Sequence, residues 1–184
     1  MLHHLRLPAS ALSTLLLFQS SVPAVAQQTP STLSTPEELA GEFAAVPCED
    51  KDRLAAVRAL YERMGAPAAD ISLDQHGHVD NLVVVKKGKS AEKIVIGAHY
   101  DKTASGCGAI DNWTGQVALT HLYKTLRDVP LNKTLVFVAF GREEKGLIGS
   151  RAMTRNIDDD EVAGYCAMIN IDSLGLGPPQ VADN

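Results

Sequence analysis

Positive charge is not in excess in this sequence, and its later part has no apolar run long enough to cross a membrane. The 184 residues carry 17 Lys and Arg against 22 Asp and Glu, for a formal net charge of −5. A basic surface for nucleic acid is therefore not expected. The longest later apolar run, residues 135–140, has the length of a strand. Hydrophobic residues at 45% and charged residues at 21% are ordinary for one globular domain and argue against disorder and low complexity.

Cysteine is scarce as well. The chain holds three, Cys48, Cys107 and Cys166, and their wide separation disfavours a zinc site built from cysteine. An exported chain has room for one disulfide bond and one remaining thiol, but the sequence does not decide the pairing. Cys107 lies in a glycine-rich loop, where we expect a small residue in a tight turn in preference to an exposed thiol.

The first residues have the pattern of a secretory signal peptide. Arg6 precedes a short apolar run at residues 11–18, and residues 24–26 (AVA) resemble a cleavage site. The run is well below the roughly 20 residues that span a bilayer, which disfavours a membrane anchor. We therefore predict a signal peptide over residues 1–26, a folded domain over residues 27–184, and a secreted or periplasmic protein without membrane contact after cleavage.

Helix and strand patterns alternate along the domain. Thr35, followed by Pro36 and Glu38, has the pattern of a helix start, and this helix should run to about Val46. This alternation predicts an α/β fold with a largely parallel sheet. Further helices are expected at residues 54–64, 114–126 and 146–153, and strands at residues 82–85, 93–98, 134–140 and 165–171.

Acidic residues and one histidine follow three of these strands directly. Ligands in open α/β sheets bind outside the carboxyl ends of the strands, so these side chains are expected to converge. Each group alone has an ordinary explanation as a helix cap or a loop hydrogen bond. Their coincidence at one sheet edge, with two adjacent glutamates that repel each other, favours a cation site. The candidates are His99, Asp101, Asp111, Glu143, Glu144 and Asp172.

Four ordered segments carry these residues: GAHYD (97–101), GAIDNWTG (108–115), VAFGREEKGLIGS (138–150) and INIDSLG (169–175). Together they resemble the co-catalytic di-zinc aminopeptidases, a family that includes secreted bacterial leucyl aminopeptidases, glutamate carboxypeptidases and the related glutaminyl cyclases. The resemblance spans residues 78–181. It implies a zinc-exopeptidase-like three-layer sandwich with a largely parallel mixed central sheet, and peptide substrates with a free N-terminus.

The resemblance also implies a set of metal ligands. His99 and Asp172 would bind one zinc ion, Glu144 would bind a second, and Asp111 would bridge both. A carboxylate suits the bridging position because it has two oxygens. An oxygen-rich site of this kind would also accept manganese or cobalt.

Two further acids have implied roles in catalysis. Glu143 would be the general base that takes a proton from the attacking water. Asp101 would hydrogen-bond the ligating histidine and fix its tautomer. The resemblance further implies a cis peptide bond between Asp111 and Asn112.

One ligand of the resembled family has no counterpart here. In that family the second zinc ion receives a histidine far downstream of the last aspartate, whereas residues 173–184 contain none. His76 and His78 are expected in a turn, and His121 within a helix, so they are poor substitutes. We therefore expect a peptidase domain that is incomplete at its C-terminus, with its last strand at an exposed edge. If the 184 residues are the complete product, we expect at most one tightly bound zinc ion per chain.

Three functions from different classes fit these observations. The chain is the N-terminal part of a secreted aminopeptidase, a short relative that binds metal or peptide without efficient hydrolysis, or a glutaminyl cyclase-like acyltransferase that uses one zinc ion. The short loop between Asp101 and Asp111 and the Asp111-Asn112 pair favour the peptidase over the cyclase.

Overall fold

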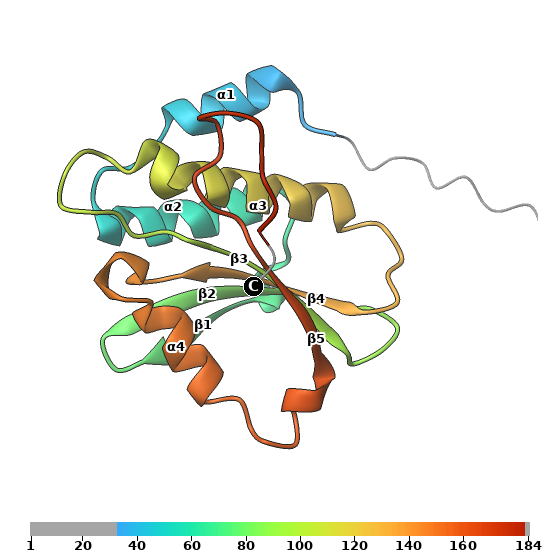
Figure 1. The fold of residues 1–184 in the computed structure, drawn as a ribbon. Helices are drawn as coiled ribbons and strands as arrows, with labels where there is room; N and C mark the ends of the chain where they lie inside the picture. Colours follow the sequence, from blue (N-terminus) through green and yellow to red (C-terminus); the bar gives the residue numbers. More distant parts are fainter. Residues whose placement is uncertain (1–32, 183–184) are drawn as a thin grey trace, which may run out of the picture.

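A five-stranded mixed sheet with helices on both faces forms the fold (Figure 1). The computed structural model describes residues 33–182, so the predicted signal peptide at residues 1–26 lies outside the described residues and stays a prediction. The strands are β1 (Ile71–His76), β2 (Val79–Lys86), β3 (Lys93–His99), β4 (Thr134–Phe140) and β5 (Tyr165–Asn170). The helices are α1 (Pro36–Ala44), α2 (Asp50–Arg63), α3 (Thr114–Leu126) and α4 (Ile148–Arg155), with short helical turns at Ala68–Asp70, Ala109–Trp113, Glu143–Lys145 and Val162–Gly164.

The parallel part of the sheet consists of β3, β4 and β5. The strand order is β1-β2-β4-β3-β5, and β3 pairs in parallel with β4 on one side and β5 on the other. Strands β1 and β2 form an antiparallel hairpin, and β2 is antiparallel to β4. The carboxyl ends of β3, β4 and β5 therefore meet at one edge of the sheet, as a ligand site in an α/β fold requires.

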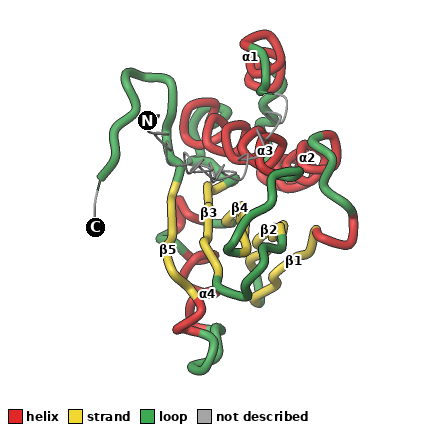
Figure 2. Tube along the Cα trace, turned by 90° about the vertical axis from the view of Figure 1, so that its right-hand side faces the viewer, coloured by secondary structure: helices red, strands yellow, loops and turns green. Residues whose placement is uncertain are grey.

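Helices cover the sheet on both faces, which confirms the predicted three layers (Figure 2). Helices α1, α2 and α3 lie on one face and α4 lies on the other. The larger core lies between the sheet and α2 and α3, where Tyr61, Tyr123 and Phe137 pack edge to face with ring centroids 5.4 to 6.4 Å apart. Under α4 a smaller core includes Val95 and Val138. Central strands buried on both faces explain the nearly continuous apolar runs in β3 and β4.

Local sequence signals set the helix ends. The Thr35 hydroxyl accepts a hydrogen bond from the Glu38 N–H at 3.2 Å, and the Glu38 carboxylate accepts one from the Thr35 N–H at 3.0 Å, which confirms the predicted capping box at the start of α1. Helix α2 stops just before Gly65, whose φ of 86° is the left-handed conformation that glycine adopts readily. No helix within residues 33–182 combines the length and the apolar character needed to cross a membrane.

Strand β1 was not predicted from the sequence. Its residues (ISLDQH) are mostly polar and exposed, and Ile71 is its one buried side chain. Pairing with β2 holds it in place, in a register that joins Ile71 to Val84 and His76 to Val79. The expectation that His76 lies in a turn is wrong, because His76 ends β1 and the two-residue turn consists of Gly77 and His78.

Strand β5 lies at the edge of the sheet, as expected. Within residues 33–182 it pairs with β3 alone. Its apolar side chains are consequently exposed, with Met168 at 53% and Ile169 at 52%. An apolar strand with a free edge is an aggregation hazard unless another surface covers it.

Candidate metal centre

The six predicted site residues gather beyond the carboxyl ends of β3, β4 and β5. These strands are parallel, so side chains that are far apart in sequence reach the same edge of the sheet. The site takes His99 and Asp101 from the end of β3, Glu143 and Glu144 from the turn after β4, Asp172 from the segment after β5, and Asp111 from the turn that leads into α3.

The imidazole of His99 lies at the centre of this group. Its Nε2 atom is 3.0 Å from Asp111 Oδ1, 3.7 Å from Asp172 Oδ1 and 3.9 Å from Glu143 Oε2. The His99 side chain is 2% exposed, whereas those of Asp111 and Asp172 are 56% and 42% exposed. One buried nitrogen thus faces three carboxylates that are open to solvent.

Asp101 orients the two glutamates. Its Oδ1 accepts a hydrogen bond from the Glu143 N–H at 2.8 Å, and its Oδ2 accepts one from the Glu144 N–H at 3.1 Å. The nearest contact of its carboxylate to His99 Nδ1 is longer, at 3.6 Å, while the Asp101 backbone carbonyl lies 3.1 Å from that nitrogen. The backbone carbonyl is therefore the better partner for His99, and the carboxylate holds the turn after β4.

The hydrogen bond to the Asp101 carbonyl determines which imidazole nitrogen is free. With Nδ1–H donating to that carbonyl, the Nε2 lone pair points to the carboxylates, which is the tautomer that a metal ion needs. Burial alone would lower the pKa of His99, but the nearby carboxylates of Asp101, Asp172 and Glu143 outweigh it and raise the pKa to about 9. Burial acts to raise the pKa of Asp101, but the nearby His99 imidazole and the hydrogen bonds from the Glu143 and Glu144 N–H groups outweigh it, so the pKa is lowered.

Glu144 provides the test of whether a cation fits. Its Oε1 atom is buried and has no hydrogen-bond partner within residues 33–182. Burial raises the pKa of Glu144, and the negative charge of Asp111 raises it further. A cation would supply the missing partner and offset the repulsion between the acids. One imidazole nitrogen with several carboxylate oxygens is a donor set that suits zinc.

Two groups of residues are arranged to hold a metal ion within the described part of the chain. One is His99, Asp111 and Asp172, and the other is His99, Glu143 and Glu144; in each, the ligand atoms lie within 4.8 Å of one another. Both groups include His99, whose free nitrogen has a single lone pair and serves one ion at a time. The geometry thus brings all four predicted ligands together, and their roles as ligands stay predictions.

We expect zinc titration of the metal-free protein at about pH 7.5 to show about one tight ion per chain and the release of about one proton. With a pKa of about 9, His99 is mostly protonated at that pH and must lose its proton to bind metal. Apparent affinity should therefore rise as the pH increases toward 9. Calorimetry in two buffers of different ionisation enthalpy measures the number of protons released on zinc binding. The His78→Gln variant is the control, because His78 lies outside the metal groups. Two ions retained after dialysis, or no buffer dependence, would contradict the expectation.

Asn112 holds the segment that carries Asp172, a role that sequence reasoning missed. Its Nδ2 donates to the Ile171 carbonyl at 2.9 Å, and its Oδ1 accepts from the Ser173 N–H at 3.2 Å. Asn112 therefore hydrogen-bonds to the backbone on both sides of Asp172. The same Oδ1 atom accepts from the Gly115 N–H at 3.0 Å, a helix-capping interaction at the start of α3. The Asp111–Asn112 peptide bond is cis, as the resemblance implied.

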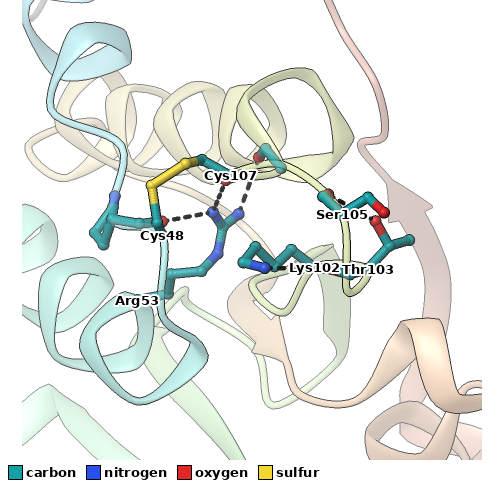
Figure 3. The surroundings of a disulfide bond; sticks show 8 residues. Cys48, Arg53, Lys102, Thr103, Ser105 and Cys107 are labelled. Atoms are coloured by element: carbon teal, nitrogen blue, oxygen red, sulfur yellow. Dashed lines mark hydrogen bonds between the residues drawn. A yellow bond between two sulfur atoms is a disulfide. The ribbon is translucent and has the colours of Figure 1, made fainter.

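A disulfide bond closes the loop before Asp111. Cys48, just before α2, is bonded to Cys107 (Figure 3). Cys166 is a free, exposed thiol. The expectation that Cys107 is merely a small residue in a tight turn is wrong. The two bonded cysteines are 59 positions apart in sequence, and their contact depends on how α2 packs beside the loop. That packing has no sequence signal of its own.

The remaining histidines of the described chain lie outside the two candidate metal groups. His76 Nε2 is 2.8 Å from Asp74 Oδ1, and His121 on α3 contacts the Ser34 hydroxyl. His78 lies in the turn between β1 and β2. None of these three belongs to either candidate metal group within residues 33–182.

Sequence comparison relates this arrangement to known peptidases. Residues 81–182 match the model of peptidase family M28. The chain is 32% identical over 98 residues to aminopeptidase YwaD of Bacillus subtilis, a match that covers 52% of this chain and 22% of YwaD. It is 35% identical over 99 residues to the probable lipoprotein aminopeptidase LpqL of Mycobacterium tuberculosis, covering 53% of this chain and 20% of LpqL. The match thus spans about a fifth of the length of these curated relatives.

Solved structures show the same fold. A zinc aminopeptidase from Bacillus subtilis matches with a TM-score of 0.51 at 31% identity, over 52% of this chain and 24% of that one. An Acidobacteriales bacterium glutaminyl cyclase matches with a TM-score of 0.69 over 84% of this chain and 64% of that one, but its 18% identity shows likeness of fold alone. The family match over residues 81–182, more than half of the chain, shows that this protein with its mixed sheet and clustered acids belongs to peptidase family M28.

Proposed function

We propose that this protein is a secreted, zinc-dependent aminopeptidase that hydrolyses N-terminal amino acids from peptides. The observation that carries the proposal is the gathering of Asp111, Asp172 and Glu143 around the free nitrogen of His99. The aminopeptidases among the relatives support the substrate class. Secretion rests on the predicted signal peptide at residues 1–26, with cleavage after Ala26.

The metal ligands would come from three strand ends. One zinc ion would be held by His99, Asp111 and Asp172. Three is the usual number of protein ligands at a catalytic zinc. Asp111 and Glu144 would hold a second ion more weakly, because both contribute carboxylates alone. Zinc bound here would polarise the substrate carbonyl and lower the pKa of the attacking water.

Glu143 would act as the general base. Its carboxylate lies beside His99. Its backbone N–H is bonded to the Asp101 carboxylate, so the position of its Cα atom is fixed. The Glu143 side chain is 33% exposed, which leaves it within reach of water. It would take a proton from the attacking water and pass that proton to the leaving amine.

The acids would also select the substrate end. A peptide with a free N-terminus carries a positive charge at neutral pH, and the site presents several carboxylates to solvent. Attraction between them favours a substrate whose first residue has an unblocked amine over one whose amine is acetylated.

Hydrolysis of an amino-acid anilide tests the proposal. We expect amine release that a chelator abolishes and added zinc restores, with no release from the N-acetylated anilide as the matched control. Equal cleavage of both anilides would contradict an aminopeptidase. Cyclisation of a substrate with N-terminal Gln, without anilide cleavage, would identify an acyltransferase instead. Zinc binding without either reaction would identify a non-catalytic relative.

A further inference from the structure

We propose that Arg53 is a positioning residue of the metal centre. By bonding to backbone carbonyls it sets the geometry of residues 100–108, here called the ligand loop, which lie between His99 and Asp111. Arg53 lies on α2, outside the segment that matches the peptidase family, and its hydrogen bonds within residues 33–182 go to backbone carbonyls and not to the side chains of the proposed ligands. The inference rests on the proposed metal site. It concerns how that site is held in shape, not which residues bind metal.

The guanidinium group of Arg53 bonds to four carbonyl oxygens. Nε donates to the Tyr100 carbonyl, and Nη1 donates to the Pro47 carbonyl at 3.0 Å and to the Cys107 carbonyl at 2.7 Å. Nη2 donates to the Gly108 carbonyl at 3.1 Å. Figure 3 shows this group lying between the disulfide and the loop. Arg53 is fully buried, at 0% exposure.

Three of these carbonyls, those of Tyr100, Cys107 and Gly108, lie at the two ends of the ligand loop, and the fourth, that of Pro47, lies just before α2. Tyr100 lies between His99 and Asp101, and Gly108 comes shortly before Asp111. A single rigid, planar group therefore fixes the distance between the two ends of the loop. Residues 103–106 between them are exposed, so the loop has little packing of its own to hold that distance.

The chemistry of arginine explains why this residue type is needed. Its five N–H donors point outward in one plane, so they reach several acceptors at once, whereas the ammonium group of lysine is a compact point. Within residues 33–182 Arg53 forms no ion pair, and its cation lies 5.4 Å from the centre of the Trp113 ring. A buried charge that bonds to carbonyls alone is costly to desolvate, so its main effect is to fix the positions of those carbonyls and not to stabilise the fold.

The first test compares Arg53→Lys with the wild-type chain. We expect the zinc dissociation constant, measured by competition with a chromophoric chelator, to rise by roughly 10-fold or more, as when a group that orients metal ligands is lost. The visible spectrum of the cobalt-substituted protein should change with it, because that spectrum reports ligand geometry. Arg58→Lys, an exposed position on the same helix, is the matched control and should change neither.

A second measurement does not depend on metal. In the metal-free Arg53→Lys variant, amide hydrogen exchange in residues 101–108 should be faster than in the wild type, while exchange in α3 stays the same. A folded variant with unchanged zinc affinity, cobalt spectrum and loop exchange would overturn the proposal. Failure of the wild type to bind zinc would refute the proposed function, and loop exchange would still decide whether Arg53 holds the loop.

A third variant covers the case in which Arg53→Lys does not fold. Arg53→Ala leaves space for a small guanidinium compound. Methylguanidinium is expected to restore zinc binding, and methylammonium, which has the charge without the planar donors, is expected to restore much less. Equal effects of the two compounds, or no effect of either, would contradict the proposal.

Discussion

Replacing Glu143 by Gln is expected to lower kcat for an amino-acid anilide by about 10²- to 10⁴-fold, the usual contribution of a general base. The amide has the shape of the carboxylate but cannot take a proton from water. Zinc affinity should change little, because His99, Asp111 and Asp172 remain. The backbone N–H of residue 143 still donates to Asp101, so the turn after β4 keeps its place. Steady-state kinetics and a zinc titration measure the two effects separately.

The control for this variant is Glu62→Gln on α2. Glu62 is an exposed glutamate that pairs with Arg58 and lies outside the metal groups, so its loss should leave kcat unchanged. Activity that survives Glu143→Gln would refute the role of Glu143 as base. A rise in KM with an unchanged kcat would assign Glu143 to substrate binding instead.

Removing the disulfide bond with Cys48→Ser and Cys107→Ser together is expected to lower the free energy of unfolding by about 4 kcal/mol. The estimate follows from the 59-residue separation of the two cysteines, since a cross-link over a long loop restricts the unfolded chain strongly. The midpoint of thermal unfolding should fall by roughly 10 °C for a domain of this size. Calorimetry of the metal-free protein measures both.

Two controls separate the cross-link from the loss of a thiol. Cys166→Ser removes the free, exposed cysteine and should change stability by less than about 0.5 kcal/mol. A reducing agent should destabilise the wild type to the level of the double variant and leave the double variant unchanged. A double variant as stable as the wild type would contradict the expectation and would mean that noncovalent contacts, such as those of Arg53 and the bond from the Lys102 N–H to Asp50, suffice to hold the loop against α2.

The gathering of the site residues was predictable because it follows from topology. Strands that read as buried runs, separated by helical patterns, place their carboxyl ends together, and the acids at those ends must then meet. His99 and Asp172 are far apart in sequence, yet His99 ends β3 and Asp172 follows β5, and these two parallel strands pair directly. Strand β1 escaped prediction because pairing with β2, not an apolar pattern, makes it a strand.

The contacts that hold the ligands were not predictable. Arg53 lies in a helix rich in charged residues, where a sequence pattern assigns arginine to the solvent side, and its burial depends on carbonyls from a distant loop. Asn112 accepts a helix-capping bond from the Gly115 N–H, as an asparagine before a helix commonly does, but its amide also bonds to the chain around Asp172. Backbone acceptors exist at every position, so no residue pattern marks them.

Because β5 is an edge strand, metal binding would be coupled to how firmly β5 pairs with β3. Asp172 follows a strand that has one neighbour among residues 33–182, and Asn112 ties the adjacent residues to the start of α3. An ion held by both His99 and Asp172 would add a cross-link between the ends of β3 and β5. By thermodynamic linkage, whatever loosens β5 must weaken the ion's hold, and binding of the ion must reduce fraying of β5 to the same extent. Aggregation through the open edge should accordingly respond to metal concentration.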